Sequence, residues 1–225
     1  MKNKVIPNII AILIIIIIFM LVCEYKEFDI KYYEKMHELN NITSIINIEF
    51  NELISVNQTV IDYIKGNISS MDIISNINNL DTRFFNDKEI LHMVDVKGIY
   101  TIFNMIKYLM IGLLVVLTIY YFNTKNSVIL LVNTFIKNIH NLVIIVMTLT
   151  TYILIDFKQF WHQFHLIFFT NDLWLLDPLT DRMIQMYPTN FFSNMILEMG
   201  IIYIIIIIVL YISAIIYQRK VRNND

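Results

Sequence analysis

The sequence has few of the residues that metal-binding, disulfide-rich and nucleotide-binding proteins depend on. Its 225 residues include one cysteine, three prolines and four glycines. Because Cys23 is the single cysteine of the sequence, an internal disulfide and a multi-cysteine metal site are excluded. The glycines are isolated from one another, so there is no phosphate-binding loop, Rossmann fingerprint or serine-hydrolase elbow. Charged residues make up 16% and the formal net charge is -2, which gives no basic signature for nucleic-acid binding.

Hydrophobic residues are what the sequence has in excess. They make up 57% of the chain, 47 residues are isoleucine, and the mean hydropathy is +0.60. Four apolar stretches reach or approach the roughly 20 residues that a helix needs to cross a bilayer, where every backbone group must be bonded internally. We predict an all-α polytopic membrane protein, one integral membrane domain over residues 1–225, with transmembrane helices at about 5–23, 101–122, 139–156 and 195–217.

Two further expectations concern the upstream limit of the second span and the retention of the first. The second span is extended upstream if the Lys107 side chain reaches toward the headgroups. No cleavage site with small residues follows the first span, so we expect it to be a retained anchor rather than a removed signal peptide.

Basic residues at the ends of the predicted spans set the expected orientation. Seven of them flank the spans, with Asp225 as the only acid: Lys2, Lys4, Lys125, Lys137, Arg219, Lys220 and Arg222. The positive-inside rule therefore predicts that both termini and the loop 123–138 are cytoplasmic. Segments 24–100 and 157–194 are then expected on the extracytoplasmic side.

The first outer segment is long enough to form a mainly helical cap. Apolar residues recur at three- and four-residue spacing over 30–39 and 42–64, which predicts helices lying on the bilayer or on each other. Asn86, followed three residues later by Glu89, resembles a capping box. We therefore expect a helix to begin there and to run through Gly98 into the second span.

Histidine is the residue type best suited to chemistry in this sequence. His92 lies in the pattern Glu89-x-x-His92-x-x-Asp95, whose spacing keeps these side chains roughly on one face of a helix. A neighbouring acid could fix the imidazole tautomer or raise its basicity, making His92 a general acid or base at the outer membrane surface. The same pattern is also typical of a capped, solvated helix start without catalytic function.

Two more histidines lie in an aromatic stretch after the third span. If residues 157–169 are helical, five aromatic side chains form one apolar stripe, which His165 borders while His162 points further out. This arrangement is also typical of an aromatic belt at the membrane interface with incidental histidines. Glu89 and His92 together with these histidines could alternatively supply a mixed metal site.

Two sets of motifs resemble those of a known membrane family. The first is His92-Met93-Val94-Asp95-Val96-Lys97, which is similar to the family's His-x-x-Asp-Val-Lys element. The second comprises Phe164-His165-x-x-Phe168-Phe169, Trp174-Leu175-x-Asp177-Pro178-x-x-Asp181 and Tyr187-Pro188-x-x-Phe191-Phe192. On these motifs, their order and the four-span hydropathy, the sequence resembles the lipoprotein intramolecular transacylases (Lit) of low-GC Gram-positive bacteria. Tyr187 is a mild departure, because Phe is expected more often at that position.

The resemblance implies acyl transfer within one substrate, without a cofactor or a metal. The substrate is a bacterial lipoprotein whose N-terminal cysteine carries a diacylglyceryl group. Its sn-2 acyl chain moves to the α-amine of the same cysteine, which gives a lyso-form lipoprotein in the membrane. Conversion of an ester into an amide is favourable in free energy. An α-amine has a pKa near 8, so about a tenth of it is neutral at pH 7 and able to attack the ester.

The resemblance also implies which residues act. The family's two functional histidines correspond to His92 and His165. We expect His92 to be the base, because Asp95 or Glu89 could raise its basicity, and His165 to be the acid and oxyanion partner. The residues expected to shape the loop over the site are Trp174, Asp177 and Asp181.

Two other functions are consistent with the sequence. A non-enzymatic membrane sensor or lipid-interacting protein would tolerate replacement of the histidines. A metal-dependent membrane hydrolase would bind zinc or manganese and lose activity with a chelator. Acyl transfer, unlike a non-enzymatic function, requires the outer segments 24–100 and 157–194 to meet, because each carries one of the two histidines.

Overall fold

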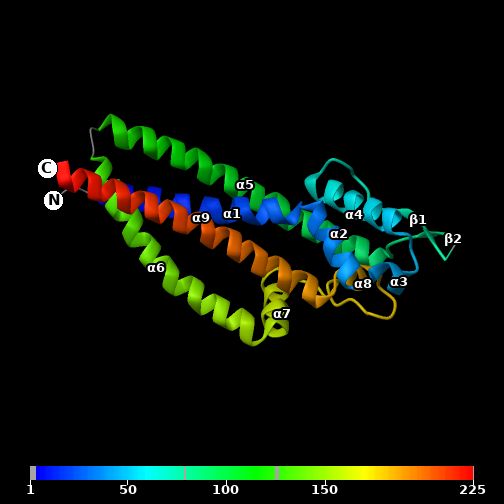
Figure 1. Ribbon diagram of the computed structural model, residues 1–225. Coiled ribbons are helices and arrows are strands. Elements are labelled where there is room, and N and C mark those ends of the chain that lie inside the picture. Colours follow the sequence, from blue (N-terminus) through cyan, green and yellow to red (C-terminus); the bar gives the residue numbers. More distant parts are fainter. Residues whose placement is uncertain (1–3, 79, 125–126, 225) are drawn as a thin grey trace. The chain divides into compact units, whose positions relative to one another are not determined.

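The chain folds almost entirely into helices. The computed structural model describes residues 4–78, 80–124 and 127–224, and in this part of the chain there are nine helices and one two-stranded sheet (Figure 1). The elements are α1 Val5–Glu27, α2 Ile30–Leu39, α3 Ile42–Ile46, α4 Phe50–Lys65, β1 Ile74–Ile77, β2 Leu80–Arg83, α5 Asp87–Asn123, α6 Val128–Ile155, α7 Phe157–Phe168, α8 Arg182–Met186 and α9 Thr189–Asn224. Lys2, Lys125 and Asp225, on which the predicted orientation partly depends, lie outside the described residues.

The elements divide into two compact units. The first, which we call the span unit, comprises Met1–Glu24, Met105–Phe157 and Leu197–Asp225. The second, which we call the cap unit, comprises Tyr25–Asn104 and Lys158–Ile196. Each unit brings together segments that are far apart in the sequence.

Four helices in the described part of the chain are long and apolar enough to cross a membrane. They are α1, α5, α6 and α9. The prediction of an all-α membrane protein with four transmembrane helices is therefore confirmed at the level of fold class.

Helix α5 is longer than a bilayer requires. Its 37 residues rise about 56 Å at about 1.5 Å per residue, whereas the hydrocarbon core is about 30 Å thick. Charged residues gather in its first third, among them Asp87, Glu89 and Lys97, and such groups are costly in hydrocarbon. We therefore infer that the membrane-spanning part of α5 is the predicted segment 101–122 and that His92 lies outside it.

Apolar side chains from α1, α6 and α9 hold the span unit together. Ile15, Ile139, Tyr203 and Ile207 belong to one buried cluster. Tyr203 Oη donates a hydrogen bond to the Ile15 carbonyl oxygen at 3.2 Å. Because lipid tails are as apolar as isoleucine, close packing and such interhelical hydrogen bonds are what favours helix association in a membrane.

Three helix ends meet at one end of the span unit. Asn138 Nδ2 of α6 donates to Asn8 Oδ1 of α1 at 3.1 Å, and Gln218 Nε2 of α9 donates to Asn133 Oδ1 of α6 at 2.7 Å. The beginnings of α1 and α6 and the C-terminal turns of α9 therefore lie together. This is the arrangement that an even number of spans with basic flanks on one side requires.

The structure differs from the sequence expectation at two places in the span unit. Helix α6 begins at Val128, so most of the expected loop 123–138 is helical, and Ile136 is buried within it. Lys107 is paired with a neighbouring helix. Its side chain is buried and its Nζ donates to Glu24 Oε2 at 2.5 Å, because an opposite charge on α1 compensates the lysine there.

The cap unit has a hydrophobic core of its own. Leu53, Met71, Phe84 and Met186 are among its buried members and come from α4, the segment after it, the end of the hairpin and α8. Sequence segments that precede α5 and that follow α6 thus share one core. The core fixes the position of the first turns of α5, where Met93 is also buried.

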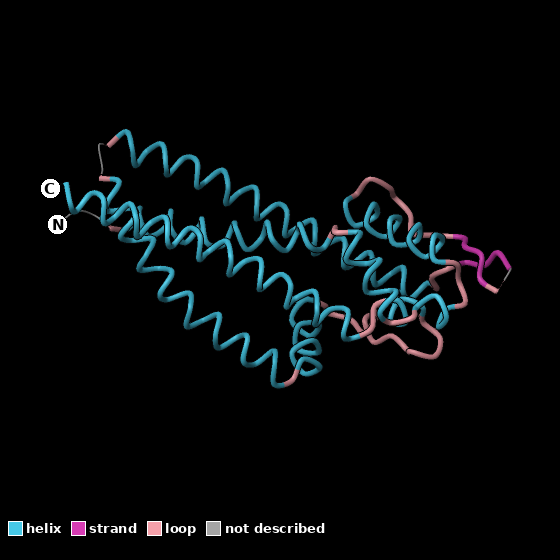
Figure 2. Tube along the Cα trace, in the orientation of Figure 1, coloured by secondary structure: helices cyan, strands magenta, loops and turns pink. Residues whose placement is uncertain are grey.

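Two features of the cap unit break the predicted helical pattern. The expected helix over 42–64 is divided, because Asn47 adopts the left-handed conformation (φ 59°) at the end of α3. Asparagine tolerates this conformation better than most residues. The hairpin β1–β2 was not expected, and Figure 2 shows it as the only strands in the drawn chain.

The hairpin lacks the alternating pattern that identifies strands. Ile77 pairs with Leu80 across a two-residue connection that begins with Asn78, whose φ is 53°. The buried side of β1 carries Ser75 as well as Ile77, and Ser75 Oγ donates to Glu52 Oε1 at 2.7 Å. Since the buried position is polar, hydropathy could not reveal this strand.

Candidate active site

His92 and His165 lie close together in the cap unit. Their ring centroids are 6.4 Å apart and the ring planes are inclined by 30°. His92 comes from the second turn of α5 and His165 from the last turn of α7, and both side chains are buried. The structure therefore brings together the two histidines that the sequence motifs single out.

The His165 imidazole is held in a defined orientation. Its Nδ1 lies 2.7 Å from the Trp161 carbonyl oxygen, which can only accept, so Nδ1 carries the proton and donates. Trp174 stacks on the ring at 4.8 Å, Phe169 stacks at 5.4 Å, and Trp161 packs edge-on at 4.9 Å. In the neutral ring Nε2 then carries the free lone pair.

His92 lies in a less polar environment. Its Nδ1 is buried and has no hydrogen-bond partner in the described part of the chain, and the Phe169 ring lies 5.0 Å away. Burial lowers the pKa of His92 to about 4, and the neighbouring His165 adds to the shift, while Asp95 opposes it. His92 is therefore neutral at pH 7.

The pKa of His165 is lowered as well. Burial is the main cause, and the hydrogen bond to the Trp161 carbonyl opposes it by favouring the protonated ring. Both imidazoles are thus uncharged at neutral pH, when each has one N–H group and one lone pair.

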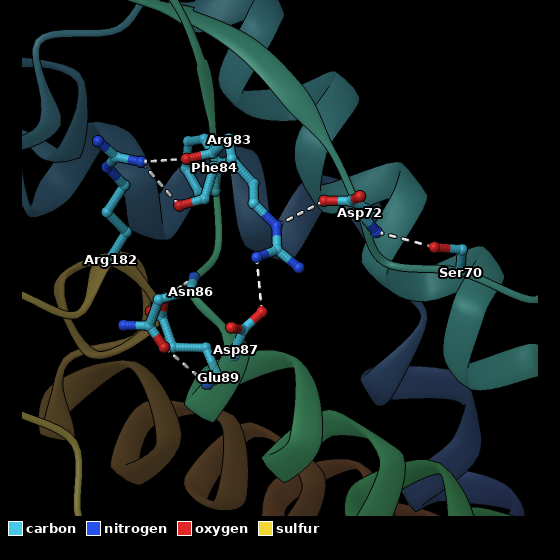
Figure 3. A network of polar contacts seen from close by, with 8 residues as sticks. All are labelled: Ser70, Asp72, Arg83, Phe84, Asn86, Asp87, Glu89 and Arg182. Atoms are coloured by element: carbon cyan, nitrogen blue, oxygen red, sulfur yellow. Dashed lines mark hydrogen bonds and ion pairs between the residues drawn. The ribbon is translucent and has the colours of Figure 1, made fainter.

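Among the described residues Glu89 forms no hydrogen bond with His92, and it organises the start of α5. Its Oε2 accepts the Asn86 N–H at 2.7 Å, and Asn86 Oδ1 accepts the Glu89 N–H at 3.0 Å, which is the predicted capping box (Figure 3). Glu89 Oε1 accepts the Met183 N–H at 2.6 Å. Burial raises the pKa of Glu89, while the two N–H groups oppose that shift.

Other acidic side chains connect α5 to the loop before α8. Asp95 Oδ2 accepts Asn171 Nδ2 at 2.8 Å. Asp181 is buried and accepts Asn86 Nδ2 at 2.9 Å and the Asp177 N–H at 2.7 Å. The acids near His92 in the sequence therefore position the loop that carries Trp174, instead of pairing with an imidazole.

His162 is not part of the buried pair. Its side chain is exposed and its ring meets Trp174 edge-on at 5.3 Å. Among the residues that the structure describes, no group of three or more His, Cys, Asp or Glu side chains is placed to hold a metal ion. Glu89, which the mixed metal site would have used, is bonded to two backbone amides.

His37 is a third buried histidine, which the sequence patterns did not single out. His37 Nε2 accepts Asn57 Nδ2 at 2.7 Å, and Asn57 Oδ1 accepts the Tyr187 hydroxyl at 2.7 Å. Burial lowers the pKa of His37. The hydroxyl group that Tyr187 has and Phe would lack thus donates to the buried amide of Asn57. No local sequence pattern links His37, Asn57 and Tyr187.

Comparison with known proteins identifies the family and the fold. The chain matches the family model of the lipoprotein intramolecular transacylase Lit over residues 8–192. A search of curated proteins gave no significant match.

Solved structures of the membrane integral lipoprotein intramolecular transacylase Lit from Bacillus cereus are similar to the chain. One has a TM-score of 0.78 at 22% identity and covers 99% of this chain and 98% of that chain. Two others, also 22% identical and covering 99% of this chain, carry a histidine replaced by alanine or by arginine. They have TM-scores of 0.71 and 0.72 and are covered over 96% and 94% of their own length.

Proposed function

Because the chain belongs to the Lit family, which is named for a lipoprotein intramolecular transacylase, an acyltransferase, we propose that it moves the sn-2 acyl chain of a diacylglyceryl-modified cysteine to the α-amine of the same cysteine. The observation that carries the proposal is the pair of buried imidazoles, 6.4 Å apart between ring centroids, from α5 and α7. The reaction requires one proton to leave the amine and one to reach the departing glyceryl oxygen, and imidazole is suited to both transfers.

The roles that we propose differ from the expected ones, because His165 is both the base and the acid and His92 is the oxyanion partner. His165 Nε2 has a free lone pair because Nδ1–H donates to Trp161, so His165 takes the amine proton as the nitrogen attacks the ester carbonyl. His92, neutral and lacking a carboxylate partner, offers an N–H to the oxyanion of the tetrahedral intermediate. The protonated His165 then delivers its proton to the sn-2 oxygen as the C–O bond breaks.

The surroundings of His165 support a lipid substrate. Leu166 and Ile167 follow it on α7 and expose 53% and 75% of their side chains, whereas His165 lies on the buried face. An exposed apolar surface beside a buried polar site suits acyl chains near the headgroup region. Holding amine and ester together in this site would supply part of the rate enhancement, since both belong to one molecule.

We also propose that the cap unit is extracytoplasmic, since the positive-inside rule assigns the basic helix ends to the cytoplasm. The ester of a diacylglyceryl group in the outer leaflet lies just below the headgroups, and the cysteine amine lies just above it. A site in the cap unit, at residues that precede the spanning part of α5, is consistent with this depth.

Expression in a bacterial strain that lacks lipoprotein N-acylation tests the proposal. Acyl migration leaves the molecular mass unchanged, so fragmentation mass spectrometry must locate the chain on the cysteine nitrogen. We expect conversion by the wild type, a loss of about 10²-fold or more in His92→Ala and His165→Ala, and retained activity in the exposed control His162→Ala. His92→Gln, which keeps an N–H donor, should retain more activity than His165→Gln.

Three outcomes would contradict the proposal. No migration with the wild type would favour a non-enzymatic lipid-interacting protein. Full conversion by both alanine variants would remove the histidines from the mechanism. Loss of activity with a chelator, together with stoichiometric zinc or manganese in the purified protein, would favour metal-dependent chemistry.

A further inference from the structure

A hollow of about 310 Å³ lies at the start of α5, within the cap unit. This volume is at the lower end of the range of about 300–1,000 Å³ that is usual for ligand sites. The residues that line it and matter here are Arg83, Asn86, Asp87, Glu89, Thr180 and Arg182. Phe84 and Phe85 also line the hollow, but most of its lining residues are polar or charged, which suits a hydrogen-bonding ligand.

The two arginines of the hollow differ in how they are bonded (Figure 3). Arg83 is engaged at both sides, with Nε 2.6 Å from Asp72 Oδ1 and Nη1 2.6 Å from Asp87 Oδ1. Arg182 uses Nη1 to donate to the carbonyl oxygens of Arg83 and Phe84 at 2.7 and 2.8 Å.

The Arg182 guanidinium also lies over the Phe84 ring, 5.6 Å from its centroid, a contact that leaves the N–H groups of Nε and Nη2 available to a ligand. Among the described residues, its Nε and Nη2 donate no hydrogen bond and the group forms no ion pair. A guanidinium has five N–H donors, so those on Nε and Nη2 remain for acceptors from outside the chain. Carbonyl and carboxylate oxygens are the acceptors that match this planar group best.

The hollow and the histidine pair are carried by the same two segments, the start of α5 and the chain from Trp174 to Arg182. Glu89 lines the hollow and precedes His92 by three residues on α5, a rise of about 4.5 Å. Trp174 stacks on His165, and the same loop continues to Thr180 and Arg182 at the hollow. Lys88 donates to the Leu175 carbonyl oxygen and ties this loop to α5.

We propose that the hollow binds the polypeptide that continues from the acylated cysteine of the substrate, with Arg182 donating to a backbone carbonyl or an acidic side chain. This inference rests on the proposed function. When the cysteine amine and the ester lie at the imidazoles, the substrate polypeptide must continue from the cysteine carbonyl group in a direction away from the two rings. The six residue steps from Asn86 to His92 rise about 9 Å, which an extended peptide covers in about three residues.

Synthetic substrates of different length test the proposal. Diacylglyceryl-cysteine and the same compound extended by five residues are offered to the full chain in lipid nanodiscs, and KM for acyl migration and Kd for binding are measured. We expect both constants to be several-fold lower for the extended substrate. Thr180→Trp, which places an indole in the hollow, should remove this dependence on length.

Leu179→Trp is the matched control, because Leu179 is 88% exposed, adjoins Thr180 in sequence and does not line the hollow. It should keep the dependence on length. Equal Kd for the two substrates with the wild type, or an unchanged difference in Thr180→Trp, would overturn the proposal. If no acyl migration occurs, the proposed function fails, and the Kd values still decide whether the hollow binds the peptide.

Discussion

At the residue scale, burial determines what the two histidines can do. An acid next to a histidine in the sequence suggests a strengthened base, but Asp95 accepts a hydrogen bond from Asn171, and Glu89 caps α5. Removal from water instead lowers the pKa of both imidazoles. A neutral pair can move one proton from amine to alkoxide and offer one N–H to an oxyanion without a net charge in the site.

The lowered pKa values predict an unusual pH dependence. The substrate amine, with a pKa near 8, must be neutral, so log(kcat/KM) should rise with a slope of about one between pH 6 and 7. A downward pKa shift keeps each imidazole largely neutral as the pH falls through 6.5, and the pKa of about 4 for His92 places the protonation of that ring well below this range. A slope of two beginning at about pH 6.5 would contradict this prediction.

At the element scale, the start of α5 serves as the anchor for the loop before α8. Glu89 joins the capping box to the Met183 N–H, so one carboxylate fixes both the helix end and the loop. That loop carries Trp174, which stacks on His165. We infer that Glu89 is a positioning residue and acts on the site through these contacts.

Glu89→Gln should loosen the loop without changing the acid–base chemistry. The amide can accept only one of the two N–H groups, which costs about 1–3 kcal/mol for a buried donor left unbonded. We expect faster hydrogen exchange at the Asn86 and Met183 amides and a lower kcat, with the slope of the pH profile unchanged. The control Glu38→Gln, at an exposed position on α2, should alter neither exchange nor kcat. Unchanged exchange in Glu89→Gln would contradict the anchoring role.

At the scale of the whole molecule, the basic residues at the helix ends determine the expected orientation in the membrane. The helix ends with basic flanks lie together in the span unit, through the contacts of Asn8 with Asn138 and of Asn133 with Gln218. The excess of lysine and arginine at this end favours the cytoplasmic side of the membrane.

Single cysteines can report the orientation. In a Cys23→Ser background, Ser69→Cys in the cap unit and Asn223→Cys at the end of α9 both lie at exposed positions. A membrane-impermeant maleimide added to intact cells should label Ser69→Cys and leave Asn223→Cys unlabelled until the cells are opened. The reverse pattern would place the candidate site in the cytoplasm.

Much of this protein is determined by local sequence. Long apolar stretches predict the four membrane helices because hydrocarbon leaves the backbone no other partner than its own helix. The bounds of α2 and the capping box at Asn86 and Glu89 also follow from neighbouring residues. The break at Asn47 and the hairpin do not, since a left-handed residue and a buried polar Ser75 depend on their surroundings.

Only the tertiary structure decided the site. The motifs singled out His92 and His165, but their approach depends on α5 and α7 packing in one cap unit, across 73 positions of sequence (165 − 92). The same packing brings the Glu89 carboxylate to the Met183 N–H, so that it does not pair with His92. It also places the Nδ1 of His165 at the Trp161 carbonyl oxygen, so that the lone pair on Nε2 points away from Trp161. Local patterns fix helices because their hydrogen bonds are local, whereas the protonation of a buried ring is set by groups that only folding brings near it.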